Sequence, residues 1–217
     1  METLLKTPQI LALALLALPL SAQAWDLRLE APFAQGQNLP LTSVAGTPTS
    51  GTLDTGHGAI FTVSHRIMRM GPVLKYEWNA ELTQFQADGT IRQGPASASS
   101  RLRQTGAGVG VNAQFWLPFT GFAGELGLLE RVQSYRYEGG GAAEDRTLAR
   151  PWLRAGLRCV LPVGDLNPYL AASYQLPLVK DKPVQLGSAP DLGSYLGAQG
   201  AGQSFQHLWT LGVGLSF

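Results

Sequence analysis

The chain has 217 residues, of which 45% are hydrophobic and 14% are charged, and its formal net charge is +1. This length suits a single domain, and the charged fraction lies well below the roughly 25% that is usual for soluble domains. A net charge so close to zero gives no electrostatic support for a nucleic-acid partner.

The amino-terminal residues have the pattern of a cleavable signal peptide. Lys6 supplies a basic region, residues 10–20 form an apolar core, and Ala22-Gln23-Ala24 matches the A-x-A cleavage pattern. The apolar core is shorter than the roughly 20 residues that a membrane-spanning helix needs. We therefore expect residues 1–24 to be a signal peptide and residues 25–217 to form one domain.

Beyond residue 24, hydrophobic and polar residues alternate with a period of two, which is the period of a β-strand. The clearest example starts at residue 73, where Leu74, Tyr76 and Trp78 alternate with Lys75 and Glu77. The alternation predicts eight strands, at residues 25–33, 58–70, 73–86, 103–118, 122–137, 151–163, 168–180 and 207–217.

The connections between these strands alternate between long and short. Short turns are expected at Gly71-Pro72 and at residues 119–121 and 164–167, and long loops at residues 34–56, 88–100, 139–149 and 181–205. Asp88-Gly89, a common hairpin turn, marks the start of the second loop. Brief periplasmic turns and longer external loops are typical of outer-membrane barrels, whereas a soluble sandwich does not require such alternation. The sequence therefore predicts an all-β fold, an eight-stranded antiparallel up-and-down transmembrane β-barrel.

The last strand ends on Phe217 and carries bulky apolar residues on one face only. These residues, which we expect to form a membrane assembly signal, are Trp209, Leu211, Val213, Leu215 and Phe217. This strand resembles the assembly signal of Gram-negative outer-membrane β-barrels. The whole mature chain resembles the small eight-stranded members, a group that includes the OmpX-like, OmpA-barrel-like and OmpW-like families, and no motif assigns it to one of them.

That resemblance implies a location in the cell outer membrane, among its lipid and lipopolysaccharide. It also implies insertion by the barrel-assembly machinery through the last strand, and external loops that contact extracellular ligands. We expect a structural or surface-interaction barrel and no enzymatic activity. The alternatives are a narrow channel or porter for small or apolar molecules and, less favoured, a lipid A-modifying enzyme.

The polar faces of the predicted strands place eleven charged side chains in the lumen. They are Asp26, Arg28, Glu30, Arg66, Lys75, Glu77, Glu81, Glu125, Arg131, Arg154 and Arg158. An Arg or Lys facing lipid near the midplane would cost about 2–4 kcal/mol, whereas in the lumen it can pair. A structural network that largely plugs the barrel is the favoured interpretation, and a polar passage or binding site is the alternative. If the lumen is a passage or a binding site, interior glycines such as Gly108 and Gly214 leave a cavity. If the network plugs the lumen, these glycines make room for the opposing side chains.

Aromatic residues are expected in girdles at the two membrane interfaces. Trp25 and Phe217 are assigned to the periplasmic rim, and Tyr135, Tyr137 and Trp209 to the outer rim. Cys159, the one cysteine of the chain, is expected to face lipid.

The sequence offers little material for catalysis or metal binding. None of the three histidines, His57, His65 and His207, stands in a metal-ligand spacing, so no metal or cofactor is expected. Only Ser64-His65 and Ser204 near His207 could contribute to a lipid A-modifying site, and neither has an acid beside it in sequence.

Overall fold

The computed structural model describes residues 25–34, 37–39, 49–139, 142–161, 167–178 and 207–217. The predicted signal peptide and the predicted loop at residues 181–205 lie outside these residues. No helix long and apolar enough to cross a membrane occurs in the described part of the chain. The strands are β1 (Trp25–Ala34), β2 (Gln37–Leu39), β3 (Thr49–Leu53), β4 (Gly56–Met70), β5 (Leu74–Gln93), β6 (Ala96–Trp116), β7 (Phe122–Gly139), β8 (Ala142–Val160), β9 (Asn167–Pro177) and β10 (Leu208–Ser216).

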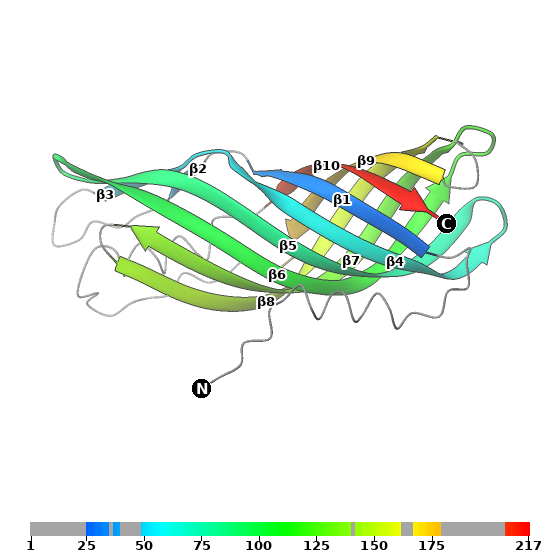
Figure 1. Cartoon of the computed structure of the whole chain (residues 1–217), viewed down its shortest axis with the longest axis horizontal. Coiled ribbons are helices and arrows are strands. Elements are labelled where there is room, and N and C mark those ends of the chain that lie inside the picture. The colour runs from blue at the N-terminus through cyan, green and yellow to red at the C-terminus, as the bar shows by residue number, and fades with distance from the viewer. Residues whose placement is uncertain (1–24, 35–36, 40–48, 140–141, 162–166, 179–206) are drawn as a thin grey trace.

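Eight of these strands close into a ring in the order β5-β4-β1-β10-β9-β8-β7-β6, and β6 pairs again with β5. All neighbours in the ring are antiparallel, which confirms the predicted fold class. The seam lies between the first and last strands, where the Trp25 and Phe217 amides each donate to the carbonyl of the other at 3.0 Å. Figure 1 shows the resulting elongated cylinder.

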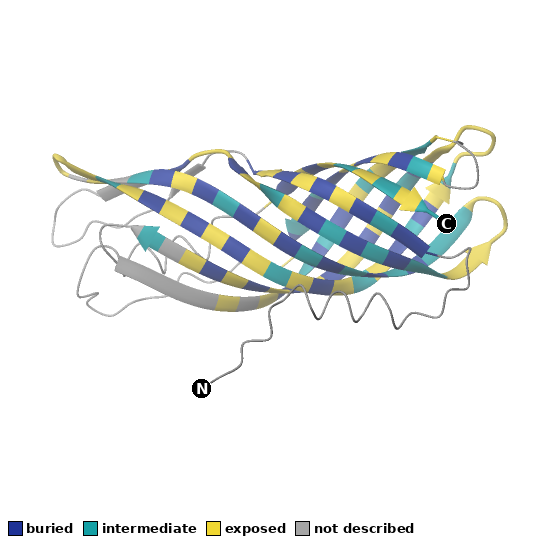
Figure 2. Cartoon of the chain, viewed as in Figure 1, coloured by how far each residue is buried: buried dark blue, intermediate teal, exposed yellow. Residues whose placement is uncertain are grey.

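The period-two alternation gives the cylinder two different faces. Exposed and buried residues alternate along the strands in Figure 2. In β6, for example, Val109 and Val111 are exposed, whereas Asn112 and Gln114 are buried. The outward side chains form an apolar belt, which includes Leu29, Phe33, Val109, Val111, Phe115, Leu126, Leu128, Val132, Leu157, Leu170, Leu211 and Val213. Such a belt suits lipid, because lipid rather than water then contacts the apolar surface.

A β-bulge interrupts β4, the strand whose alternation is least regular in the sequence. The pairing with β5 shifts between Arg66 and Met68, so Ile67 is left out of the ladder. A bulge adds one residue to one strand and bends it locally. Beyond this point Ile67, Met68 and Met70 are all exposed.

Two of the predicted loops are instead continuations of strands. β5 and β6 pair as far as Gln93 and Ala96, and the turn contains Gly94 with a positive φ of 57°. Asp88-Gly89 does not form a turn, because Asp88 stands opposite Arg101 in the ladder and pairs with its guanidinium at 2.7 Å. The loop predicted at residues 139–149 is likewise wrong, since β7 and β8 pair as far as Gly139 and Ala142.

The first predicted loop also contains strand structure. β3 pairs with residues 89–93 of β5, which lie beyond the part of β5 that pairs with β4. β2 in turn pairs with β3. Gly89 permits this approach, because a Cβ atom there would lie 2.2 Å from the Thr52 carbonyl oxygen. β3 and the outer residues of four strands (84–93, 96–105, 134–139 and 142–147) form what we term the exterior sheet, which extends beyond the ends of β1, β9 and β10 (Figure 1).

Candidate functional site

The interior of the cylinder carries a network of buried charges. Nine of the eleven predicted lumen residues are at most 5% exposed: Asp26, Arg28, Glu30, Glu77, Glu81, Glu125, Arg131, Arg154 and Arg158. The side chain of Lys75 is 15% exposed and pairs with Glu77 at 2.7 Å. Arg66 is only half-buried and lines a cavity at the end of the cylinder where the short turns lie.

One cluster joins β1 to β7, β8 and β9. Arg158 contacts Asp26 at 2.5 Å and Glu125 at 2.8 Å, and Arg28 contacts the same Glu125 oxygen at 2.7 Å. The Arg158 guanidinium lies 3.9 Å from the centre of the Tyr169 ring, and the Tyr169 hydroxyl donates to Asp26. Each carboxylate here therefore has a cation beside it, which is the condition for burying charge at tolerable cost.

A second cluster lies farther along the cylinder and is built around Glu81. Arg131 donates from Nε to one Glu81 oxygen, and Arg154 contacts the other at 2.7 Å. Arg154 also lies 3.6 Å from Glu30, whose other oxygen accepts a hydrogen bond of 2.7 Å from Thr210. These side chains come from five strands of the ring, β1, β5, β7, β8 and β10, so the cluster links strands that are not neighbours.

The outermost part of the network is not among the residues predicted from the sequence. Arg150 is 4% exposed, donates to Gln133 at 3.2 Å and lies 5.2 Å from the Trp152 ring centre. Tyr135, which was assigned to the outer aromatic girdle, is buried and accepts a hydrogen bond from Arg150, so that assignment is wrong. The alternation of side chains along a strand could have identified both residues. Arg150 is an even number of residues from the inward-facing Arg154, and Tyr135 is an even number from Gln133.

The interior glycines face long side chains. A Cβ atom on Gly108 would lie 3.0 Å from Arg131 Cγ and 3.1 Å from Glu81 Cγ. A Cβ atom on Gly214 would lie 2.2 Å from Tyr169 Cζ. At both positions the missing side chain is replaced by a neighbour's side chain rather than by empty space.

The residues considered for catalysis are not brought together. Ser64 is buried on the inner face of β4, whereas His65 packs on the outer face against Trp25, with ring centres 4.5 Å apart. His207 is exposed and lies 6.0 Å from the Tyr174 ring, and Ser204 lies outside the described residues. No metal-binding group of His, Cys, Asp or Glu is found among the residues that the structure describes.

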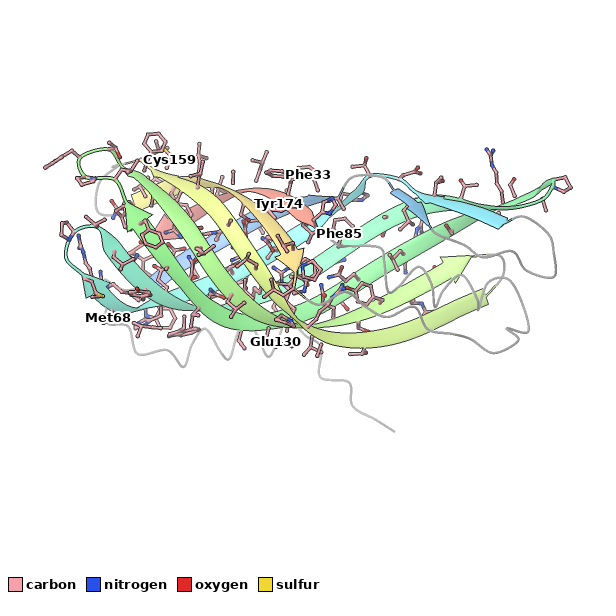
Figure 3. The ribbon with its side chains drawn as sticks, turned by 180° about the vertical axis from the view of Figure 1, so that it is seen from behind. Phe33, Met68, Phe85, Glu130, Cys159 and Tyr174 are labelled. Atoms are coloured by element: carbon pink, nitrogen blue, oxygen red, sulfur yellow. The ribbon has the colours of Figure 1, made fainter. Side chains whose placement is uncertain are left out.

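The last strand has its predicted faces. Trp209, Leu211, Val213 and Leu215 are exposed on the outer wall. β10 pairs with β9 over its whole length and with β1 from Trp209 to Ser216. Cys159 lies on the outer face of β8, labelled in Figure 3, and is half-buried.

The outward face of the exterior sheet carries a basic patch, which we define as Arg92, Arg101, Arg103 and Arg136. All four side chains are exposed, and Arg103 and Arg136 stand directly opposite each other on β6 and β7. Acids on this face neutralise part of the charge: Asp88 pairs with Arg101 at 2.7 Å, Glu138 pairs with Arg136 at 2.8 Å, and Asp145 of β8 stands directly opposite Arg136. The hydrogen bond from Arg136 lowers the pKa of Glu138, and the hydrogen bond to Asp88 raises the pKa of Arg101.

Comparisons with known proteins identify the fold. No protein-family model matches the chain, and no curated protein does. Among solved structures it is similar to Ail, the attachment invasion locus protein of Yersinia pestis, with 11% identity over 90% of this chain and 99% of that chain and a TM-score of 0.50. Neisserial surface protein A is 11% identical over 89% and 97% of the two chains, with a TM-score of 0.48. The chain therefore has the fold of the small eight-stranded β-barrels of the Gram-negative outer membrane, and that fold and the apolar belt indicate the same location.

Proposed function

We propose that this protein is a surface-interaction barrel, in which the cylinder anchors the chain in the outer membrane and the exterior sheet binds partners outside the cell. The observation that carries the proposal is the basic patch on the exterior sheet. Arg92, Arg101, Arg103 and Arg136 share this face with Asp88, Glu138 and, by register, Asp145.

The arrangement of the patch favours an anionic partner. Like charges directly opposite each other destabilise a sheet, and Arg103 and Arg136 occupy such a pair of positions, with Asp145 opposite Arg136 on the β8 side only. An anion bound between them would relieve that repulsion. The exposed Asp88–Arg101 and Arg136–Glu138 pairs oppose binding weakly, because solvent screens exposed ion pairs. The partner is therefore a polyanion, such as a sulfated polysaccharide.

Sucrose octasulfate, which is bound to Ail as a heparin analogue in one solved structure, provides a defined probe. We expect the detergent-folded protein to bind it, and the Arg103→Gln/Arg136→Gln variant to bind about tenfold more weakly for each arginine removed, because charge-assisted hydrogen bonds contribute about 1.5–3 kcal/mol each. Isothermal titration calorimetry at two salt concentrations measures the affinity and its salt dependence.

The matched control is Arg66→Gln/Arg69→Gln, which removes the same charge at the opposite end of the cylinder. Unchanged affinity in this control assigns the binding to the exterior sheet. Equal losses in both double variants, or no binding by the unsubstituted protein, would contradict the proposal.

We also propose that the lumen is closed to solutes. The support is the burial of the charged clusters around Glu81 and Glu125, together with the glycines that neighbouring side chains overlie. We expect the protein to show no stable single-channel conductance in planar bilayers. Steady currents that disappear in Gly108→Phe would instead establish the alternative, a narrow channel.

The final strand supports a further part of the proposal. Trp209, Leu211, Val213 and Leu215 form an exposed apolar row that ends next to Phe217. We propose that this row is read by the barrel-assembly machinery and afterwards contacts outer-membrane lipid.

A further inference from the structure

A cavity of about 470 Å³ opens at the end of the cylinder opposite the exterior sheet. It lies between the β4–β5 turn and the β6–β7 turn, at the end where Trp25 and Phe217 meet. Short turns lie on the periplasmic side of outer-membrane barrels, so the cavity opens at the depth of the inner, phospholipid leaflet. Its volume is within the roughly 300–1,000 Å³ of ligand pockets.

The charge in this cavity is of one sign. Arg66, Arg69 and Lys75 line it, and no acidic residue is among the described residues of its wall. Lys75 also contacts the carboxylate of Glu77 at 2.7 Å, and Glu77 is buried below the wall. Arg69 donates from Nε to the Gly71 carbonyl at 3.0 Å, which leaves its two Nη groups available for a ligand.

The rim of the cavity is apolar and exposed. Pro72, Leu117, Pro118 and Phe119 line it; Leu117 is 60% exposed, and Phe119 is fully exposed. Phe119 also has a positive φ of 64°, a conformation that a bulky residue rarely adopts. An aromatic side chain held outward in this way is unfavourable in water and favourable at a lipid interface.

We propose that this cavity binds the phosphate of an anionic phospholipid from the inner leaflet, and that Leu117 and Phe119 contact its glycerol backbone and acyl chains. The cationic wall suits a phosphate diester, whereas a free anion would gain nothing from the apolar rim. The site is separate from the basic patch of the exterior sheet and does not depend on the function proposed for it.

Native mass spectrometry of the full chain, titrated with phosphatidylglycerol or phosphatidylcholine, tests the proposal. We expect phosphatidylglycerol to bind more tightly. A lysine or arginine near an anionic lipid surface contributes about a fivefold gain in binding, so Arg66→Gln/Arg69→Gln should weaken phosphatidylglycerol binding by roughly 25-fold. The control is Arg103→Gln/Arg136→Gln, which should bind the lipid as the unsubstituted protein does.

Two further binding measurements distinguish a lipid ligand from a soluble anion. Glycerophosphoglycerol, the headgroup without acyl chains, should bind far more weakly than phosphatidylglycerol, and Phe119→Ser should weaken binding of the lipid alone. Heat-modifiable migration in gels verifies that each variant is folded. Equal binding of the two lipids, equal binding of the soluble headgroup, or equal losses in the two double variants would each overturn the proposal. If a variant fails to fold, the comparison of the three ligands on the unsubstituted protein still decides it.

Discussion

Replacing Glu81 with glutamine is expected to lower the free energy of unfolding by about 3–5 kcal/mol. Glu81 accepts from Arg131 and lies 2.7 Å from Arg154, and all three residues are at most 3% exposed. Glutamine keeps the shape but removes the negative charge, so two buried guanidinium groups lose their shared carboxylate. Urea unfolding of the protein in lipid vesicles, followed by tryptophan fluorescence, measures the change.

Glu130→Gln provides the matched control, because it makes the same chemical change on the other face of the wall. Glu130 is exposed on the outer surface of β7 between Leu128 and Val132, and Figure 3 labels it. Acidic residues on the lipid face are destabilising by less than the roughly 2–4 kcal/mol of Arg or Lys. Glu130→Gln should therefore leave the stability unchanged or slightly raised. A loss as large as that of Glu81→Gln would show that the position of the charge does not matter, and would contradict the buried network.

The second large effect is expected at Gly214 in the closing strand. In Gly214→Ala, the new methyl group would lie 2.2 Å from Tyr169 Cζ and 2.6 Å from the Leu27 carbonyl oxygen. Tyr169 cannot move freely, because its hydroxyl donates to Asp26 and Arg158 packs on its ring. Overpacking of this kind costs about 1–3 kcal/mol, so the unfolding free energy should fall by that amount in the same urea assay.

Gly124→Ala is the control for this substitution. Gly124 lies in β7, and no atom is within 4 Å of the position that its Cβ would take. The alanine should be tolerated without loss, and replacement of a glycine within a strand favours folding slightly. If both alanine variants unfold at the same urea concentration, the overlap with Tyr169 is not a constraint on the closing strand.

The sequence was sufficient to predict the ring of strands and the direction in which most side chains point. Alternation is a local property, so Val109 and Asn112 could be assigned to opposite faces without knowledge of any partner strand. The assignment of Tyr135 to the interface is wrong because an aromatic residue near a strand end was interpreted as an interface anchor. Tyr135 is two residues from the inward-facing Gln133, so the alternation places it inside.

Local pattern could not predict which strands pair beyond the membrane. Asp88-Gly89 has the composition of a hairpin turn, but pairing with Arg101 and the approach of β3 keep it extended. Local pattern also could not predict which charged residues pair within the lumen, because the register of the strands around the ring determines those pairs. Asp26 and Arg158, for example, are 132 residues apart and meet only when the cylinder closes.

The distribution of these partners has a consequence for biogenesis. The β7–β8 hairpin carries Glu125, Arg131, Arg154 and Arg158. Arg158 pairs with Glu125 within the hairpin, whereas the carboxylates that neutralise Arg131 and Arg154 lie on β1 and β5. A hairpin entering the bilayer alone would bring unneutralised ions and unpaired backbone amides into hydrocarbon. We therefore expect entry of this hairpin into the membrane to be coupled to its pairing with the carboxylates of β1 and β5.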